Sequence, residues 1–301
     1  MSKISLGVSV EGGVSEAAQF EELGADMLWA PSHLASPVGI PDGIVGLAQL
    51  SALSTRARIG ISAMVLPLYQ PAVIAKQLAD IDVFSGGRVV LGVGVGGEFG
   101  AEFRAVGVAQ PQRGARANEA IEVLRKLWTG EEVTHRGRFF DMERVKILPK
   151  PKQQGGPPVI VAGRKPPAMR RAAELGDGWF PYLYSPERYA RSVEEVRGYA
   201  AAAGRDLSAF EWHVLAFVRI GRDGDQARRQ AADELGYYYG QDFLPMVERV
   251  TAAGTQAEVT ARLQAFVDAG ARHLNISLIG SDRLHQLELL VNEIIPALRV
   301  T

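Results

Sequence analysis

The chain has 301 residues, of which 47% are hydrophobic and 22% are charged, enough to bury the core of one barrel or of two ordinary domains. Its net charge of −1 arises from interspersed acids and bases, so neither a nucleic-acid surface nor a membrane-binding face is expected. The lack of cysteine excludes disulfides, thiolate nucleophiles and cysteine metal sites, and favours a cytoplasmic protein.

The chain opens with a strand-like pattern rather than a signal peptide, and no apolar run reaches membrane-spanning length. Eight apolar segments are predicted to be strands, namely residues 4–10, 26–30, 58–66, 88–95, 158–162, 178–182, 211–220 and 273–279. Eight helical patterns accompany them, at residues 15–23, 46–54, 72–84, 115–128, 167–175, 186–203, 255–269 and 282–298. At three junctions the helix stops at a glycine, and an apolar strand follows shortly afterwards.

This alternation predicts an α/β fold. Eight strands alternating with eight helices is the count of a (β/α)8 TIM barrel. A doubly wound parallel sheet is the alternative, because alternation alone does not prove that the sheet closes. We therefore predict a single barrel domain over residues 1–301, with an insertion at 131–158 and a long excursion at 223–254.

The insertion and the excursion interrupt the regular alternation. The insertion contains a hairpin-like stretch at 133–140 and a proline-rich stretch at 149–152. The excursion is too long for a simple connection and contains the aromatic run Tyr237-Tyr238-Tyr239. Insertions on the catalytic face of a barrel shape substrate access, and we expect that role for both segments. A subunit contact or an ornament is the alternative for each.

The stretch at 88–100, RVVLGVGVGGEFG, joins a β-branched strand to a glycine-rich end. Gly92, Gly94, Gly96 and Gly97 lack a Cβ atom, so a flat ligand or another backbone segment could come close to them. A crowded strand end without a ligand is the alternative. The glycine spacing does not fit the dinucleotide-binding fingerprint G-x-G-x-x-G.

Polar residues at the carboxyl ends of the strands are the catalytic candidates, because those ends form the active site of a barrel. His33 begins the loop after the second strand, which favours a functional role over a purely structural one. Glu98 is the carboxylate nearest the glycine-rich end, and Glu102 follows one turn later. Either is a candidate proton donor, or an acid in the first turn of a helix, which the helix dipole favours.

Gly163, Arg164 and Lys165 lie between the fifth strand and a helix that begins at a proline. Free N–H groups and the positive end of the helix dipole favour an anion at such a start, and both basic side chains add charge. We therefore predict that this turn binds the phosphate of a cofactor or a substrate. No two histidines form an H-x-H or H-E-x-x-H pair, so no catalytic metal is expected. The chain also lacks a G-x-S-x-G elbow and a Walker loop.

The segment 84–94, FSGGRVVLGVG, resembles the bacterial luciferase-like family of flavin and deazaflavin oxidoreductases, especially its coenzyme F420-dependent branch from actinobacteria. The resemblance covers nearly the whole chain and includes Leu28-Trp29 with His33, and the segments 69–76, 118–128, 157–163 and 176–179. It departs from many deazaflavin members at Ser32, where they carry Asp. It also departs at Gly97, which separates Glu98 from the G-x-G after which some members place their catalytic acid.

The resemblance implies a TIM barrel that holds an isoalloxazine-like ring at the end of the third strand. A non-proline cis peptide would form a bulge there, at Ser62-Ala63. The ring would be flanked by His33 and by the strand end that includes Gly94, Val95, Gly96 and Gly97. The cofactor phosphate would lie at the turn formed by Ala162, Gly163, Arg164 and Lys165, in agreement with the helix-start argument.

The leading hypothesis is a deazaflavin (coenzyme F420)-dependent oxidoreductase that transfers a hydride between C5 of the cofactor and a carbon of a small organic substrate. His33 would orient or protonate the substrate, and Glu98 is the candidate acid. One alternative is an FMN-dependent monooxygenase that needs a partner flavin reductase. Another is a barrel that binds a cofactor or ligand without turnover. Analogy with the family suggests a homodimer.

Overall fold

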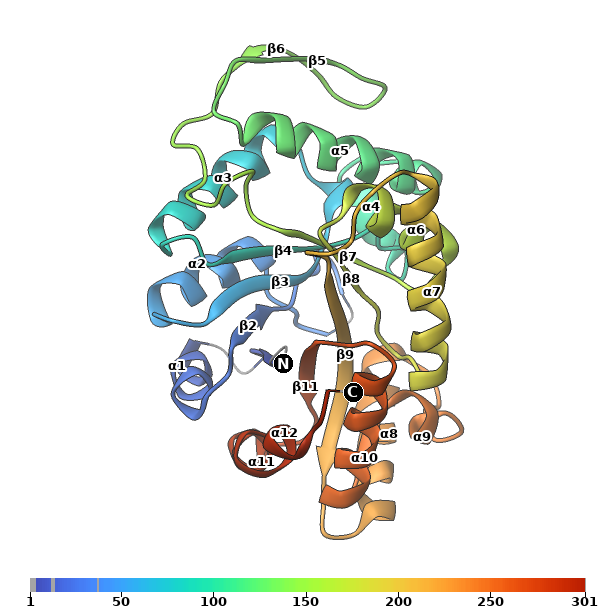
Figure 1. Ribbon diagram of the computed structural model, residues 1–301. Helices are drawn as coiled ribbons and strands as arrows, with labels where there is room; N and C mark the ends of the chain where they lie inside the picture. Colours follow the sequence, from blue (N-terminus) through green and yellow to red (C-terminus); the bar gives the residue numbers. More distant parts are fainter. Residues whose placement is uncertain (1–3, 12–13, 37, 301) are drawn as a thin grey trace.

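Eight parallel strands form a closed barrel in the computed structural model, which describes residues 4–11, 14–36 and 38–300 (Figure 1). The barrel strands of this part of the chain are β1 (Ser5–Ser9), β2 (Met27–Ala30), β3 (Arg58–Val65), β4 (Val89–Gly94), β7 (Val159–Ala162), β8 (Gly178–Phe180), β9 (Glu211–Ile220) and β11 (His273–Leu278). Each pairs with the next in this order, and β11 returns to pair with β1. The predicted TIM barrel is confirmed, because the ring of strands leaves no open edge.

Helices surround the barrel and largely follow the predicted positions. They are α1 (Val14–Leu23), α2 (Gly43–Leu53), α3 (Pro71–Phe84), α4 (Gly100–Ala105), α5 (Arg113–Leu127), α6 (Pro166–Leu175), α7 (Pro186–Ala202), α8 (Gly224–Tyr239), α9 (Val247–Val250), α10 (Gln256–Asp268), α11 (Arg283–Leu289) and α12 (Ile295–Ala297). The last predicted helix is interrupted by a π-helical turn at Leu290–Ile294, just before Pro296, which lacks the N–H that a regular helix needs.

The excursion contains a helix that the sequence interpretation missed. Asp223 caps α8 by accepting hydrogen bonds from the N–H groups of Asp225 and Gln226. Gly240 ends the helix in the left-handed conformation, with φ of 64°. Both end signals are present in the sequence and indicate a helix at this place. After α8 the excursion continues through α9 to the short strand β10 (Ala252–Gly254), which pairs with the end of β9.

The barrel interior is filled around one tryptophan. The Trp29 side chain is fully buried, and its ring lies 5.1 Å from that of Phe180, with Val90 and Ile160 in the same cluster. A Cβ atom at Gly60 would lie 2.4 Å from the Trp29 ring, so a side chain there would displace it. The apolar strands are buried on both faces, as expected where helices cover a parallel barrel.

The insertion forms the predicted hairpin, from the antiparallel strands β5 (Val133–Arg136) and β6 (Asp141–Val145), but the expectation that it lies on the catalytic face is wrong. It connects the end of α5 to the start of β7, and connections of that kind lie at the amino-terminal ends of the strands. Figure 1 shows the hairpin extending beyond α5, away from the barrel axis. The Glu119 carboxylate on α5 anchors its turn by accepting the Phe140 N–H at 2.9 Å.

None of the described helices is both long enough and apolar enough to cross a lipid bilayer.

Candidate active site at the barrel mouth

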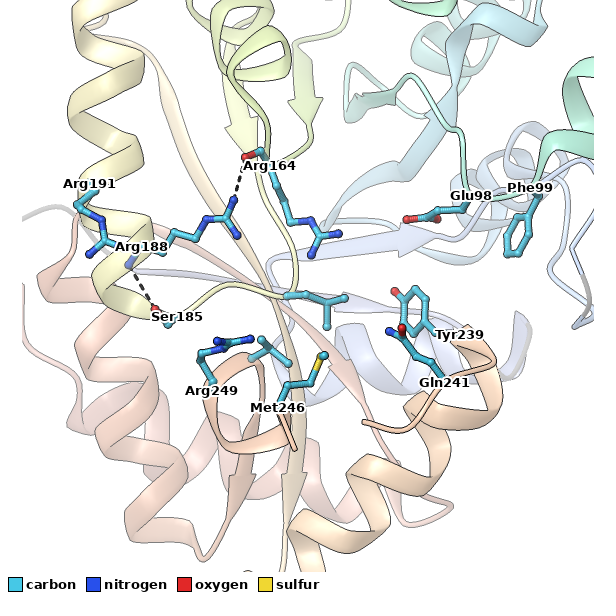
Figure 2. A pocket seen from close by; sticks show the side chains of 12 residues that line it. Glu98, Phe99, Arg164, Ser185, Arg188, Arg191, Tyr239, Gln241, Met246 and Arg249 are labelled. Carbon is cyan, nitrogen blue, oxygen red and sulfur yellow. Dashed lines mark hydrogen bonds between the residues drawn. The ribbon is translucent and has the colours of Figure 1, made fainter. Parts of the chain in front are cut away.

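A cavity of about 640 Å³ opens at the carboxyl ends of the strands. Its lining residues come from the loops after β4, β7 and β8 and from the excursion; they are Glu98, Phe99, Arg164, Leu183, Ser185, Arg188, Arg191, Tyr239, Gln241, Met246, Arg249 and Val250 (Figure 2). Five of these residues belong to the excursion, which follows a strand and therefore lies on the catalytic face. The excursion thus has the location expected of a segment that shapes access, unlike the hairpin.

The four glycines of β4 and its end serve different purposes. A Cβ atom at Gly92 would lie 2.2 Å from the carbonyl oxygen of Ile61, so this glycine relieves strand crowding. Gly96 and Gly97 have φ values of 60° and 123°, which a turn here requires and which other residues rarely adopt. An added Cβ would have ordinary van der Waals space at Gly97, where the nearest atom is 3.4 Å away, and at Gly94, where it is 3.7 Å away, but only Gly94 of these two lacks a positive φ. Close approach of a flat ligand is therefore best supported at Gly94.

The end of β3 lies beside Gly94. The Ser62-Ala63 peptide is cis, as expected, and the pairing of β3 with β4 shifts register between Ile61 and Met64. Ser62 and Ala63 are half-buried, whereas Ile61 and Met64 are fully buried. The atom found 3.7 Å from a Cβ at Gly94 is the Cβ of Ala63. The bulge and Gly94 thus form one continuous small-residue wall.

His33 is held by a buried carboxylate. Its Nδ1 lies 3.1 Å from Oε1 of Glu102, a residue of α4 whose side chain is about 1% exposed. The same oxygen accepts the N–H groups of Leu34 and Ala35, while Oε2 is buried with no hydrogen-bond partner among the described residues. The His33 ring also contacts the edge of Phe99, at 4.9 Å between centroids, so it lies one side chain behind the cavity. Glu102 therefore fixes the orientation of this histidine.

Glu98 is engaged differently from Glu102. It is exposed at the cavity, and its carboxylate accepts the Tyr182 hydroxyl proton in a hydrogen bond. Burial and the neighbouring Glu98 raise the pKa of Tyr182, so its hydroxyl stays protonated. The Arg164 guanidinium lies 4.7 Å from the centre of the Tyr182 ring. Glu98 thus acts as an acceptor within a Glu98–Tyr182–Arg164 stack, which makes it a weaker candidate for the proton donor than the sequence suggested.

The start of α6 differs in one respect from the predicted phosphate site. Pro166 and Pro167 occupy its first two positions and carry no N–H, and the N–H groups of Ala168 and Met169 bond to the Lys165 carbonyl. Favourable contacts to an anion here would come from the helix dipole and from Arg164, which lines the cavity. The side chain of Lys165 is exposed and does not line it.

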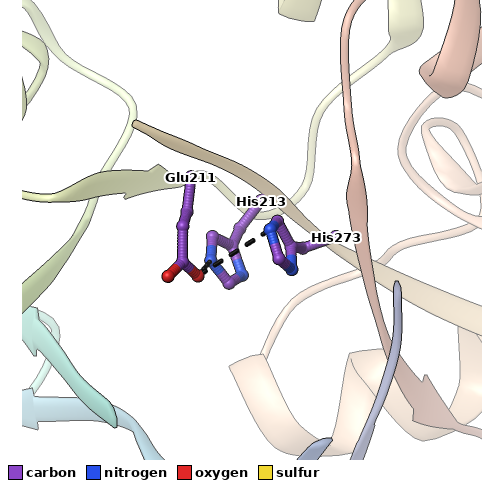
Figure 3. A group of neighbouring side chains, drawn as sticks. All are labelled: Glu211, His213 and His273. Carbon is purple, nitrogen blue, oxygen red and sulfur yellow. Dashed lines mark hydrogen bonds and ion pairs between the residues drawn. The ribbon is translucent and has the colours of Figure 1, made fainter. Parts of the chain in front are cut away.

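A second polar cluster lies at the opposite end of the barrel, where strands β9 and β11 begin. Residues His213 and His273 face each other in register, and their rings stack at 4.2 Å with an angle of 14° between planes (Figure 3). Glu211 contacts His213 Nε2 at 2.9 Å and binds both Arg58 amino groups at 2.9 Å. Nearly parallel rings cannot direct both nitrogen lone pairs at one ion, and Arg58 already neutralises the carboxylate, so these contacts favour a structural network over a metal site.

Burial lowers the pKa of both histidines in this cluster. The pKa of His273 falls to about 3, through burial and the adjacent His213. The pKa of His213 is also lowered, chiefly by burial. Its Nδ1 accepts from the amide of Asn275, which in turn accepts the Trp29 indole N–H at 2.6 Å. The spacing rules applied to the sequence did not reveal this pair, because the two histidines are 60 positions apart and meet only through strand register.

Sequence reasoning missed three groups at the mouth. It treated Glu102 only as an alternative to Glu98. Glu102 lies one turn after Glu98, in α4, and this position brings its carboxylate to His33. It assigned no role to Tyr182, the last residue of the predicted strand at 178–182. It passed over Arg188, Arg191 and Arg249, for which the only signal was their location in loops and first turns on the catalytic face.

Comparison with known proteins identifies the family. The family profile described as luciferase-like monooxygenase matches residues 5–273. The chain therefore belongs to the luciferase-like monooxygenase family. Among solved structures, an F420-dependent secondary alcohol dehydrogenase in complex with an F420-acetone adduct has a TM-score of 0.88 at 21% identity, covering 99% of both chains. This likeness shows the fold.

Curated relatives include several kinds of protein. An uncharacterised protein of Mycobacterium tuberculosis is 35% identical over 59% of this chain, and the match spans only 60% of that relative. The F420-dependent glucose-6-phosphate dehydrogenase of Kineococcus radiotolerans is 27% identical over 94% of this chain and 91% of its own length. The FMNH2-dependent dimethylsulfone monooxygenase of Pseudomonas putida is 34% identical over 61% of this chain and 50% of its own length.

Proposed function

We propose that the chain is an oxidoreductase that uses coenzyme F420 to transfer a hydride to or from a small organic substrate. The observation that carries the proposal is the wall formed by Ala63 and Gly94, which lies at the same end of the barrel as the cavity that Arg164 lines. A flat, anionic cofactor needs both features. The Kineococcus radiotolerans relative, which matches along 94% of the chain, is F420-dependent, whereas the FMNH2-dependent relative matches over 61% of it.

The residues present fit such a cofactor. Gly94 leaves room for a ring face, and the half-buried Ser62 and Ala63 offer a backbone edge next to it. Arg164 offers a permanent positive charge at the end of β7, the strand that pairs with β4. When bound, the deazaflavin would supply the hydride donor or acceptor at its C5 atom. The protein would supply binding, orientation and the exclusion of water by apolar neighbours such as Phe99 and Leu183.

His33 and Glu102 would manage the proton that accompanies hydride transfer to or from a carbonyl or alcohol. The contact with Glu102 engages Nδ1 of His33, which leaves Nε2 available to accept or donate a proton. Because Glu102 also holds the N–H groups of Leu34 and Ala35, it fixes the loop that carries the histidine. We assign Glu102 as a positioning residue and His33 as the residue that exchanges the proton.

The second candidate is an FMN-dependent monooxygenase supplied by a separate flavin reductase. The Pseudomonas putida relative favours it, since it is 34% identical over 61% of the chain, whereas the F420-dependent relative is 27% identical over 94% of the chain. The wall and Arg164 suit either ring and either phosphate. A barrel that binds a cofactor without turnover is the third candidate. Homodimer formation and a cytoplasmic location stay predictions.

Titration of the purified protein with F420 and with FMN tests the proposal. We expect F420 to bind with micromolar or tighter affinity, followed by changes in its absorbance and fluorescence. Reduced F420 should then be oxidised by at least one member of a panel of aldehydes, ketones and enones. Micromolar binding of FMN without binding of F420 would contradict the proposal in favour of the monooxygenase. Tight binding of F420 with no oxidation across the panel would favour the non-catalytic barrel.

A further inference from the structure

Among the residues that the structure describes, four arginines and one carboxylate line the cavity. Arg164 follows β7, Arg188 and Arg191 lie in the first two turns of α7, and Arg249 lies on α9 of the excursion. Figure 2 shows Arg164 and Arg188 extending into the same space, with Arg249 on the facing segment. The carboxylate is Glu98, which is engaged by Tyr182. The lining charge is therefore four positive against one negative.

The arginines of this cavity are unpaired. Within the part of the chain that the structure describes, none of the four forms an ion pair, whereas Arg58, Arg125 and Arg228 elsewhere do. Arg188 donates instead to the carbonyl of Arg164 at 3.3 Å and stacks 4.4 Å from the Tyr184 ring. These contacts orient the Arg188 guanidinium and leave its charge without a carboxylate partner among the described residues.

The position of Arg188 and Arg191 on α7 adds a second cost. The helix begins at Pro186, capped by Ser185, and the positive end of its dipole faces the cavity mouth that Ser185 lines. Basic side chains near this end are unfavourable, and like charges around one cavity repel. A bound anion removes both costs, because it pairs with the guanidiniums and with the dipole.

We propose that Arg188, Arg191 and Arg249 form a subsite for the carboxylate-bearing tail of the cofactor, beyond the phosphate that Arg164 contacts. This inference rests on the proposed function. The deazaflavin cofactor carries, after its phosphodiester, a lactate and a chain of γ-linked glutamates, each with a free carboxylate. FMN ends at a phosphate. Three further guanidiniums exceed the need of one phosphate group but match a row of carboxylates.

The alternative source of the same anionic chemistry is a substrate that carries a phosphate or carboxylate. The two sources differ in what they require of the cofactor tail. If the tail occupies the subsite, affinity for the deazaflavin rises as glutamates are added. If a substrate occupies it, affinity for the deazaflavin does not depend on them.

The test measures the dissociation constants of three forms of the deazaflavin by fluorescence. They are the form without phosphate, the form with phosphate and lactate only, and the form with several glutamates. Each is titrated into the wild-type protein, into R188Q/R191Q/R249Q, and into a control R144Q/R170Q/R197Q, which removes the same number of charges from exposed arginines outside the cavity.

For the wild-type protein and the control we expect the glutamate-bearing form to bind about tenfold or more tightly than the phosphate-and-lactate form, and the advantage to shrink at high salt. In R188Q/R191Q/R249Q the advantage should disappear, while the form without phosphate binds as in the wild type. A wild-type protein that does not distinguish tail lengths would overturn the subsite and leave the proposed function intact. A wild-type protein that binds none of the three forms would overturn the proposed function itself.

Discussion

The two ends of the barrel each carry a cluster of charged and polar side chains, largely buried at the amino-terminal end and largely exposed to the cavity at the mouth. At the amino-terminal end, Glu211 is bound by Arg58 and His213, and the second histidine stacks on the first. At the mouth, the guanidinium groups of Arg188 and Arg249 face a cavity without a carboxylate partner among the described residues.

This contrast indicates which end binds a ligand. Buried polar groups normally form hydrogen bonds within the protein. The cluster at the amino-terminal end does so through a chain of contacts from Arg58 to Trp29. Unused hydrogen-bonding and charge capacity is expected where a ligand completes the set. We therefore expect substitutions at the mouth to change ligand binding and turnover. Substitutions at the amino-terminal end should change the stability of the fold.

The largest effect should come from His33→Ala. Loss of a positioned acid or base commonly costs about 10²–10⁴-fold in rate, and His33 is the one histidine that the structure holds next to the mouth by a buried carboxylate. Substrate-dependent oxidation of reduced F420 should fall by that factor, and the melting temperature should change little. A variant with wild-type turnover would remove this histidine from the mechanism.

Glu211→Ala should affect the other end of the barrel. The substitution leaves the guanidinium of Arg58 and the imidazole of His213 without their acceptor, and breaking such a partly buried network should cost about 2–3 kcal/mol of unfolding free energy. Denaturant unfolding measures this loss. Cofactor affinity, determined below the unfolding transition, should match that of the wild type. A change of more than severalfold in affinity would show that the two ends are coupled.

The stacked histidines should make the protein sensitive to acid. Folding lowers the pKa of His273 from 6.5 to about 3. Between these two pH values the histidine is therefore protonated in the unfolded chain and neutral in the folded chain. Stability is therefore fully present above pH 6.5 and falls as the pH drops toward 3, by at most about 1.4 kcal/mol per pH unit for this histidine.

His273→Phe keeps a ring against His213 and removes the titration. Between pH 7 and pH 4.5 the variant should lose about 2 kcal/mol less unfolding free energy than the wild type, as measured by denaturant unfolding at each pH. Parallel stability curves for the two proteins would show that His273 does not govern the acid response.

The smallest effect should come from Glu98→Gln. The Glu98 carboxylate accepts a hydrogen bond from Tyr182, and a glutamine amide oxygen can accept it equally well. Turnover should stay within about threefold of the wild type. A loss of about 10²-fold or more is expected only if the substitution removes the general acid. A 10²-fold loss of turnover with unchanged cofactor affinity would identify Glu98 as the proton donor. It would contradict the role proposed for His33 and Glu102.

The strand order and most helices could be predicted from the sequence, because strand and helix periodicities and glycine stops are local signals. The wall was also predictable, through the family resemblance that located the cis peptide at Ser62-Ala63. The pairing of His33 with Glu102 was not, since it depends on how α4 turns back after the glycines. The His213–His273 stack depends on strand register, and the arginine set depends on how segments after β7, β8 and β9 surround one cavity.

A crystal structure with bound F420 would show directly whether the cofactor occupies the barrel mouth. We predict the deazaflavin ring against Ala63 and Gly94, the phosphate near Arg164, and the glutamate tail along Arg188 and Arg249. A ring bound elsewhere in the molecule, or a tail directed away from the arginines into solvent, would contradict the account.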